Sequence, residues 1–187
     1  MKLLFASAAI LGATLGSAHA TDSSVVGDWL VKDGYANIRI DNCGGKMWGI
    51  VAWERKPGGI DSENPDPAKK NRPTLGMPIL LGLAPSGPGK WSGEIYNSQN
   101  GKMYNANISL ADENTLNLEG CLFTNFACLT QQWKRVTTPP AGAAPLPPIK
   151  SATPPAKQTS AKKGAATTSD TCLRVADEAA AQANAKK

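Results

Sequence analysis

Histidine is almost absent from the 187-residue sequence, since the single one, His19, lies in a segment that we expect to be removed on export. A mature chain without imidazole excludes a Ser-His-Asp or Cys-His mechanism and a histidine-ligated metal site. The sequence also lacks a Gly-x-Ser-x-Gly motif, so a serine nucleophile has no recognisable setting. We therefore predict no catalytic residues, no metal ligands and no cofactor.

Long hydrophobic runs are also scarce. The longest apolar stretch, residues 3–16, is too short to span a bilayer. Lys2 precedes it, and Ala18-His19-Ala20 after it matches the small-x-small pattern of a signal-peptide cleavage site. We therefore predict a signal peptide over residues 1–20. The mature chain is expected to be periplasmic or secreted, to have no transmembrane segment, and to occupy an oxidising compartment.

An excess of charge is missing from residues 21–138, which contain twelve basic and twelve acidic residues. Residues 139–187 contain seven basic and three acidic residues, so the pI of about 9.1 comes from this tail. A net-neutral domain has no surplus positive charge for phosphates, and we expect no nucleic acid as a partner.

The basic tail divides into two segments. Residues 139–169 are rich in Pro, Ala, Lys, Ser and Thr. This composition has too little apolar surface to offset the conformational entropy lost on folding, which predicts a disordered linker. Ser169 or Asp170 can then cap a short Ala-rich helix within residues 170–187. The apolar stripe of this helix is narrow, so it needs a surface to dock on.

Glycine (18) and proline (14) are plentiful, which favours turns over a helical bundle. Residues 35–41 alternate between apolar and polar, and residues 103–110 do the same, as in half-buried strands. Further strands are predicted over residues 26–31, 47–54, 90–97, 116–119 and 129–136. The domain over residues 21–138 is therefore expected to be mainly β, as a small closed antiparallel barrel of about eight strands or a sandwich. Closure removes exposed edges, which favours the barrel.

Residues 56–83 interrupt the strand pattern with five prolines and are too long for a hairpin connection. Loops of this length are usually functional or disordered. The second half of the segment is apolar, which predicts that it packs on the barrel as a lid or plug.

The four cysteines suit an exported protein. Cys121 and Cys128 flank six residues between two predicted strands and are expected to form a disulfide across a hairpin. Cys43 and Cys172 leave alternatives open. They can pair and tie the tail helix to the barrel, Cys43 can stay free, or Cys172 can bridge two chains.

Five tryptophans are spread over the predicted strands. Such residues fill the interior of a small barrel, or stack on a sugar or an apolar ligand at its surface. Our candidate lining residues for a ligand site are Trp53, Leu75, Met77, Ile79 and Trp91.

Carboxylates in the interrupting segment offer a further kind of site. Asn64-Pro-Asp-Pro67 is typical of an Asx-turn stiffened by proline. Asp66 could alternatively work with Glu94 as a glycosidase-like pair, which requires the two carboxylates to face each other across a cleft.

Eleven motifs occur in an order that resembles a known family. They are Gly27-Asp-Trp29, Asp33-Gly34, Cys43-Gly44, Gly49-Ile-Val-Ala-Trp53, Asn64-Pro-Asp-Pro67, Arg72-Pro-Thr-Leu-Gly76, Ile79-Leu-Leu-Gly-Leu83, Trp91-Ser-Gly-Glu-Ile-Tyr96, Gly101-Lys-Met-Tyr104, Gly120-Cys121 and Cys128-Leu-Thr-Gln-Gln-Trp133. Together they resemble the secreted bacterial family of domain of unknown function 2147, over nearly all of residues 21–136. The resemblance implies a lipocalin-like β-barrel in the bacterial envelope and no established activity. The family commonly has a second cysteine soon after the first, where this chain has Trp48, so Cys43 needs another partner.

These observations favour a non-enzymatic envelope module that binds an apolar or amphipathic small molecule, or a cell-envelope partner, at the barrel mouth. One alternative is a histidine-independent carboxylate hydrolase. A second alternative is a structural envelope protein whose basic tail contacts anionic polymers.

Overall fold

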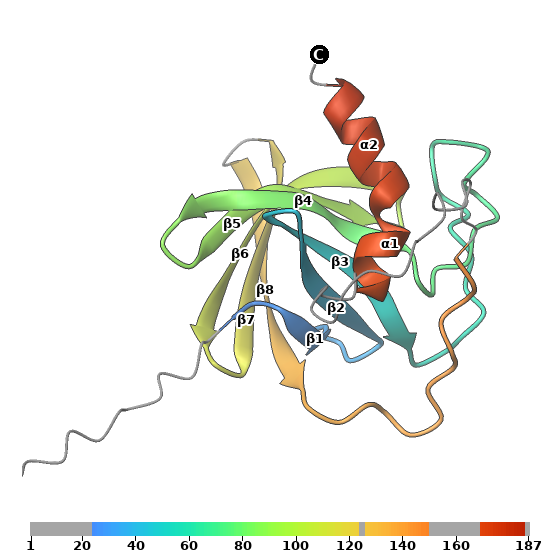
Figure 1. The fold of residues 1–187 in the computed structure, drawn as a ribbon, viewed down its shortest axis with the longest axis horizontal. Coiled ribbons are helices and arrows are strands. Elements are labelled where there is room, and N and C mark those ends of the chain that lie inside the picture. The colour runs from blue at the N-terminus through green and yellow to red at the C-terminus, as the bar shows by residue number, and fades with distance from the viewer. Residues whose placement is uncertain (1–23, 124–125, 150–168, 186–187) are drawn as a thin grey trace, which may run out of the picture.

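The alternating pattern of the sequence is realised as a closed antiparallel barrel in the computed structural model of the chain (Figure 1). The structure describes residues 24–123, 126–149 and 169–185. Each strand pairs with the next along the chain, and β8 pairs with β1 to close the barrel. The strands are β1 (Gly27–Leu30), β2 (Ala36–Cys43), β3 (Lys46–Glu54), β4 (Pro78–Gly87), β5 (Lys90–Asn97), β6 (Lys102–Asp112), β7 (Thr115–Phe123) and β8 (Phe126–Val136). The prediction of a mainly β barrel of about eight strands is confirmed.

The inward faces of the strands form the main core. In β2, for example, Ile38 and Ile40 are buried, whereas Arg39 between them is half-buried and points outward. Three of the five tryptophans, Trp29, Trp48 and Trp133, are almost fully buried. Trp29 and Trp133 belong to this core, so packing of the barrel interior accounts for two of the five tryptophans.

The expectation of one long loop over residues 56–83 is wrong in its second half, because Pro78–Gly87 forms strand β4. The connection that crosses from β3 to β4, hereafter the crossing loop, comprises residues 55–77. The pairing of β4 shifts register against both neighbours, between Leu81 and Ala84 on the β5 side. Such bulges break the period of two, so the strand lacks the alternation by which a strand is recognised.

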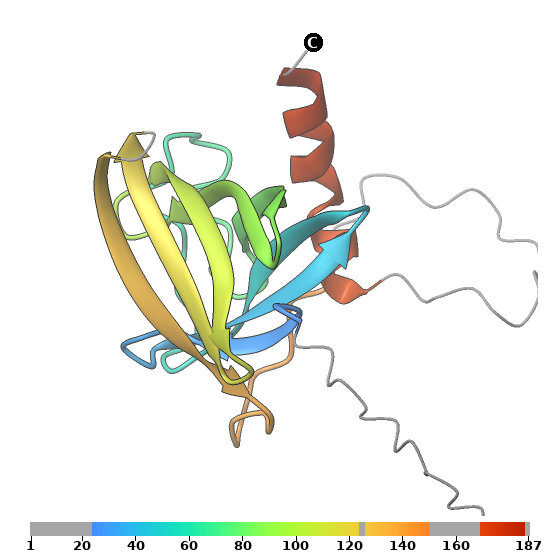
Figure 2. The same ribbon diagram turned by 90° about the vertical axis from the view of Figure 1, so that its left-hand side faces the viewer.

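A short helical segment stands outside the barrel (Figures 1 and 2). It consists of α1 (Asp170–Arg174) and α2 (Ala176–Ala185), and it contacts β2, β3 and β4. The side chain of Ser169 caps α1 by accepting a hydrogen bond from the amide of Cys172. Both the short helix and its N-cap were expected from the sequence.

The helices cover a second apolar cluster on the outer surface of the barrel, formed by Trp48, Ile50, Met77, Leu81, Tyr96 and Val175. Trp48 is 2% exposed and Val175 is 1% exposed. The C-terminal segment thus removes outward-facing apolar residues of β3 and β4 from water, and these residues are the docking surface that the narrow apolar stripe of the helices requires.

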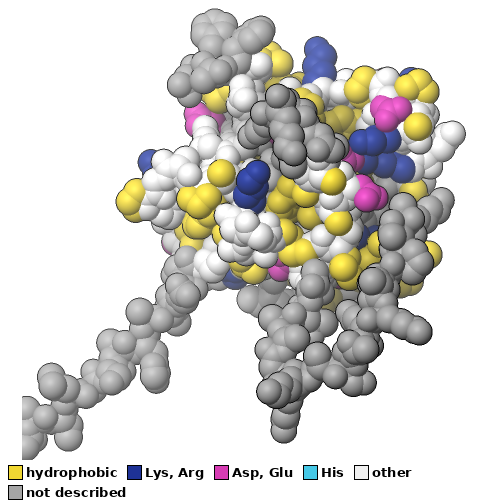
Figure 3. All heavy atoms as spheres, turned by 45° about the horizontal axis from the view of Figure 1, so that its top comes forward, with side chains coloured by type: hydrophobic (Ala, Val, Ile, Leu, Met, Phe, Trp, Pro, Cys, Tyr) yellow, Lys and Arg dark blue, Asp and Glu magenta, His cyan; other side chains and the backbone are white. Residues whose placement is uncertain are grey.

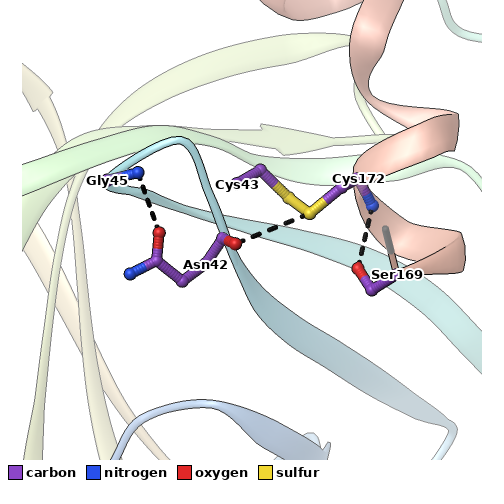
Figure 4. Close-up of a disulfide and its surroundings, with 5 residues drawn as sticks. All are labelled: Asn42, Cys43, Gly45, Ser169 and Cys172. Atoms are coloured by element: carbon purple, nitrogen blue, oxygen red, sulfur yellow. Dashed lines mark hydrogen bonds between the residues drawn. A yellow bond between two sulfur atoms is a disulfide. The ribbon is translucent and has the colours of Figure 1, made fainter. Parts of the chain in front are cut away.

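Two disulfides involve all four cysteines. Cys121 and Cys128 face each other across the β7–β8 hairpin. Cys43, at the end of β2, pairs with Cys172 in α1, across 129 residues of sequence (Figure 4). The Cys43–Cys172 bridge therefore links the tail helix covalently to the barrel wall.

The remaining expected segments are described only in part. The proposed signal peptide, residues 1–20, lies outside the described residues, as does most of the expected disordered linker, residues 150–168. In the described part of that linker, Leu146 packs against the second cluster and the carbonyl of Pro147 accepts a hydrogen bond from Arg174. Over the described residues, none of the helices has the length and apolar character needed to cross a membrane.

Candidate ligand-binding cavity

One end of the barrel contains a cavity of about 410 Å³. Its lining comes from the end that carries the β1–β2, β3–β4, β5–β6 and β7–β8 connections. The lining residues are Val31, Tyr35, Ala36, Ile38, Val51, Glu54, Thr74, Ile79, Ile95, Tyr96, Asn97, Ser98, Gln99, Asn100, Tyr104, Leu118, Gly120, Leu122, Ala127, Leu129, Gln131 and Trp133. The cavity therefore extends from the turns at this end into the barrel interior.

The lining is apolar in the interior and polar near the turns. Ile38, Val51 and Leu118 are buried wall residues that belong to the main core. The β5–β6 turn adds four consecutive polar residues, 97–100, at the rim. Small-molecule sites commonly have this arrangement, in which apolar walls bind the apolar part of a ligand and a few polar groups orient its polar end.

Glu54 provides an acidic group at the cavity mouth. It pairs with Ala36 across β2 and β3, beyond a bulge in β3, and both residues line the cavity. The Oε2 atom of Glu54 is buried and has no hydrogen-bond partner among the described residues. A buried acceptor without a donor is costly, so the Glu54 carboxylate is a candidate contact for a ligand.

The opposite end of the barrel is closed around Trp29. The guanidinium of Arg135 lies 4.1 Å from the centroid of the Trp29 ring. Arg135 also donates hydrogen bonds to the carbonyls of Ser24, Val26 and Glu113, at 2.7, 3.0 and 2.6 Å. The cavity is therefore blind at this end.

A buried carboxylate holds the crossing loop against the barrel near the cavity. Asp61 is fully buried and accepts hydrogen bonds from the Tyr96 hydroxyl, at 2.7 Å, and from the Asn64 side-chain amide, also at 2.7 Å. Arg72 forms an ion pair with Asp61 at 2.9 Å. Burial, and then the hydrogen bond to Asp61, raise the pKa of Tyr96 to about 12.

The same loop reaches the C-terminal helix. Lys69 and Arg72 contact Oε1 of Glu178 in α2, at 2.8 and 3.3 Å. These ion pairs are half-buried and join the loop to α2. On the face shown in Figure 3, basic and acidic side chains both occur among hydrophobic and polar ones.

The five candidate lining residues lie in different environments. Ile79 lines the cavity and also touches the second cluster. Leu75 and Trp91 pack against the main core, and Met77 is buried in the second cluster. Trp53 is half-buried on β3. The structure therefore brings only Ile79 of this set to the cavity.

Asp66 and Glu94 are both exposed, and neither belongs to the cavity lining. The Asn64 side chain accepts a hydrogen bond from the amide of Asp66 at 2.9 Å, which confirms the Asx-turn. Asp66 in turn accepts from the amide of Ala68. These contacts give the Asn-Pro-Asp-Pro motif a structural role in the crossing loop.

Several lining residues were missed by sequence reasoning, notably Glu54, Tyr35 and Gly120. Glu54 follows the alternating residues of β3, but the bulge in β3 between Val51 and Trp53 resets which residues point inward. Gly120 continues the inward series of β7 after Leu118, and this period of two is the signal that could have found it.

Residues 27–135 match the family described as an uncharacterised protein conserved in bacteria, DUF2147. The chain belongs to this family. The resemblance seen in its motifs is thereby confirmed, and the barrel described above represents a DUF2147 domain with a C-terminal extension. None of the curated proteins matches the chain.

The barrel is similar to a solved structure of protein HP1028 from the human pathogen Helicobacter pylori, which is described as belonging to the lipocalin family. The TM-score is 0.57 at 20% sequence identity, and the match covers 61% of this chain and 84% of that chain. At this identity the likeness concerns the fold. The DUF2147 domain is therefore a lipocalin-like barrel.

Proposed function

We propose that this DUF2147 protein is an exported envelope module that binds an apolar or amphipathic small molecule in the barrel cavity. The observation that carries the proposal is the cavity of about 410 Å³, with apolar walls and a polar rim. Small-molecule sites have volumes of about 300–1,000 Å³ and this mixture of apolar walls and few polar groups.

Two features of the chain support the binding role and the compartment. Among the described lining residues Glu54 is the single carboxylate, whereas hydrolysis by paired carboxylates requires two that face each other. The Cys43–Cys172 and Cys121–Cys128 disulfides suit an oxidising space such as the bacterial periplasm.

Filling the cavity from within tests the proposal. A Cβ added at Gly120 would meet only the side chain of Ile95, at 3.9 Å, so Gly120→Phe extends into free space in the lining. Gly87→Phe is the matched control, because Gly87 lies at the exposed end of β4 with open space around it and outside the lining. Neutral decanol, titrated calorimetrically into the mature protein, is the probe.

We expect decanol to bind the wild type and Gly87→Phe with similar affinity, and Gly120→Phe at least about tenfold more weakly because its ring occupies the apolar space. Circular dichroism and melting temperature verify that both variants fold. Absence of decanol binding to the wild type, or unchanged binding to a folded Gly120→Phe variant, would overturn the proposal.

A further inference from the structure

We propose that the polar end of the ligand is a cation with N–H donors, such as a primary ammonium, and that Glu54 binds it. This inference rests on the proposed function and specifies the chemistry of the same cavity. It excludes free fatty acids as preferred ligands.

The first argument is the unpartnered oxygen at the mouth. Glu54 lines the cavity beside Ala36, where the wall passes into the rim, and its Oε2 atom is buried without a hydrogen-bond partner among the described residues. An ammonium N–H would supply the donor, and hydrogen bonds between charged partners are the stronger kind. The apolar part of the same ligand would then extend along Ile38 and Val51 into the barrel.

The second argument is the balance of charge in the lining. Glu54 is the one charged side chain among the described lining residues, and no ion pair to it is formed by the described Lys and Arg residues. The neighbouring Arg55 directs its guanidinium toward Gly34. An anionic head group would meet a like charge here and no cation from the lining, which opposes its binding.

The third argument is aromatic. Tyr35, Tyr104 and Trp133 all line the cavity. The faces of Tyr and Trp rings attract cations through their quadrupole, and aromatic side chains are a common means of binding ammonium ligands. Anions gain nothing from ring faces. The aromatic lining and Glu54 therefore both favour a positively charged ligand.

The experiment compares three ligands with the same ten-carbon chain and different head groups. Decylamine, decanoate and neutral decanol are titrated calorimetrically into the mature wild type at about pH 7, where the amine is protonated and decanoate is ionised. The same titrations are made with Glu54→Gln, which keeps the size of the side chain and removes its charge. Glu113→Gln is the control, since it makes the same change of net charge in the exposed β6–β7 turn, away from the cavity lining.

We expect wild type and Glu113→Gln to bind decylamine at least about tenfold more tightly than decanoate, as a desolvated charge-assisted contact implies. In Glu54→Gln this preference should fall below about threefold, with decanol binding retained. If decanol binds but decylamine has no advantage, or Glu54→Gln keeps the full preference, the inference is wrong while the proposed function stands. If none of the three ligands binds the wild type, the proposed function itself fails.

Discussion

The hydroxyl of Tyr96 donates a 2.7 Å hydrogen bond to Oδ1 of Asp61, and this contact ties the crossing loop to β5. Asp61 is fully buried, and its Oδ2 atom accepts hydrogen bonds from Asn64 and Arg72. A buried carboxylate is tolerated when donors surround it in this way. The loop that contributes Thr74 to the cavity is therefore anchored by a buried polar network.

Removing the Tyr96 hydroxyl should destabilise the fold. In Tyr96→Phe the Oδ1 atom of buried Asp61 loses its donor, at a cost of about 1–3 kcal/mol in the free energy of unfolding. Urea denaturation measures this cost. Tyr104→Phe is the control, because the Tyr104 hydroxyl makes an exposed contact with Asn100, and a surface change costs within about 0.5 kcal/mol. Equal stability of the two variants would contradict the role assigned to Tyr96.

The same tyrosine predicts a loss of stability in alkali. Its pKa is about 12 in the folded protein against about 10 for an ordinary tyrosine, so the folded state favours the protonated phenol. The corresponding stabilisation is complete below about pH 10 and is lost as the pH rises to about 12. We expect the free energy of unfolding of the wild type to fall more steeply over this interval than that of Tyr96→Phe. Parallel slopes for the two proteins would contradict the shift.

The elements predicted correctly are those whose cause is local. Residues 36–41 alternate in polarity because one face of β2 is buried, and Ser169 caps α1 by a contact with a residue only three positions away. Strand β4 was missed because its register shifts against β3 and β5 disrupt the alternation. Bulges depend on pairing between strands, which a single sequence does not display.

Predicting the cavity lining requires contacts between residues that are far apart in the sequence. Large apolar residues such as Met77 and Leu75 were plausible lining residues by composition, but Met77 packs under α1 and α2 in the second cluster. That cluster exists because the C-terminal segment docks on the outside of the barrel. The contact that buries Met77 is made by a segment far away in the sequence, since the Cys43–Cys172 disulfide that holds it spans 129 residues.

Arg135 should stabilise the closed end of the barrel through its shape as well as its charge. A lysine at this position keeps the charge but loses the planar stacking on Trp29 and the fork of donors to Ser24 and Val26. We expect Arg135→Lys to lower the free energy of unfolding by about 1–2 kcal/mol. Arg39→Lys is the control, since Arg39 pairs with Asp28 on the outer face with 39% of its side chain exposed, and such pairs contribute about 0–1 kcal/mol. A larger loss from Arg39→Lys would contradict this account of the closed end.

The Cys43–Cys172 disulfide should keep the C-terminal helices on the barrel. Chain-entropy reasoning gives a constraint of about 4.7 kcal/mol for a closed loop of about 100 residues, while α1 and α2 offer the barrel little apolar surface beyond Val175. In the double variant Cys43→Ser/Cys172→Ser, we expect at least about tenfold faster hydrogen exchange at the amides of Val175 and Ala179, because local opening of α1 and α2 is no longer restrained. Their hydrogen bonds to the carbonyls of Thr171 and Val175 make these amides reporters of the docked helices.

The variant Cys121→Ser/Cys128→Ser, which opens only the β7–β8 hairpin, should leave both amides protected. Unchanged exchange in the first variant would mean that packing of Val175 and the Glu178 ion pairs with Lys69 and Arg72 hold the helices without the covalent bond.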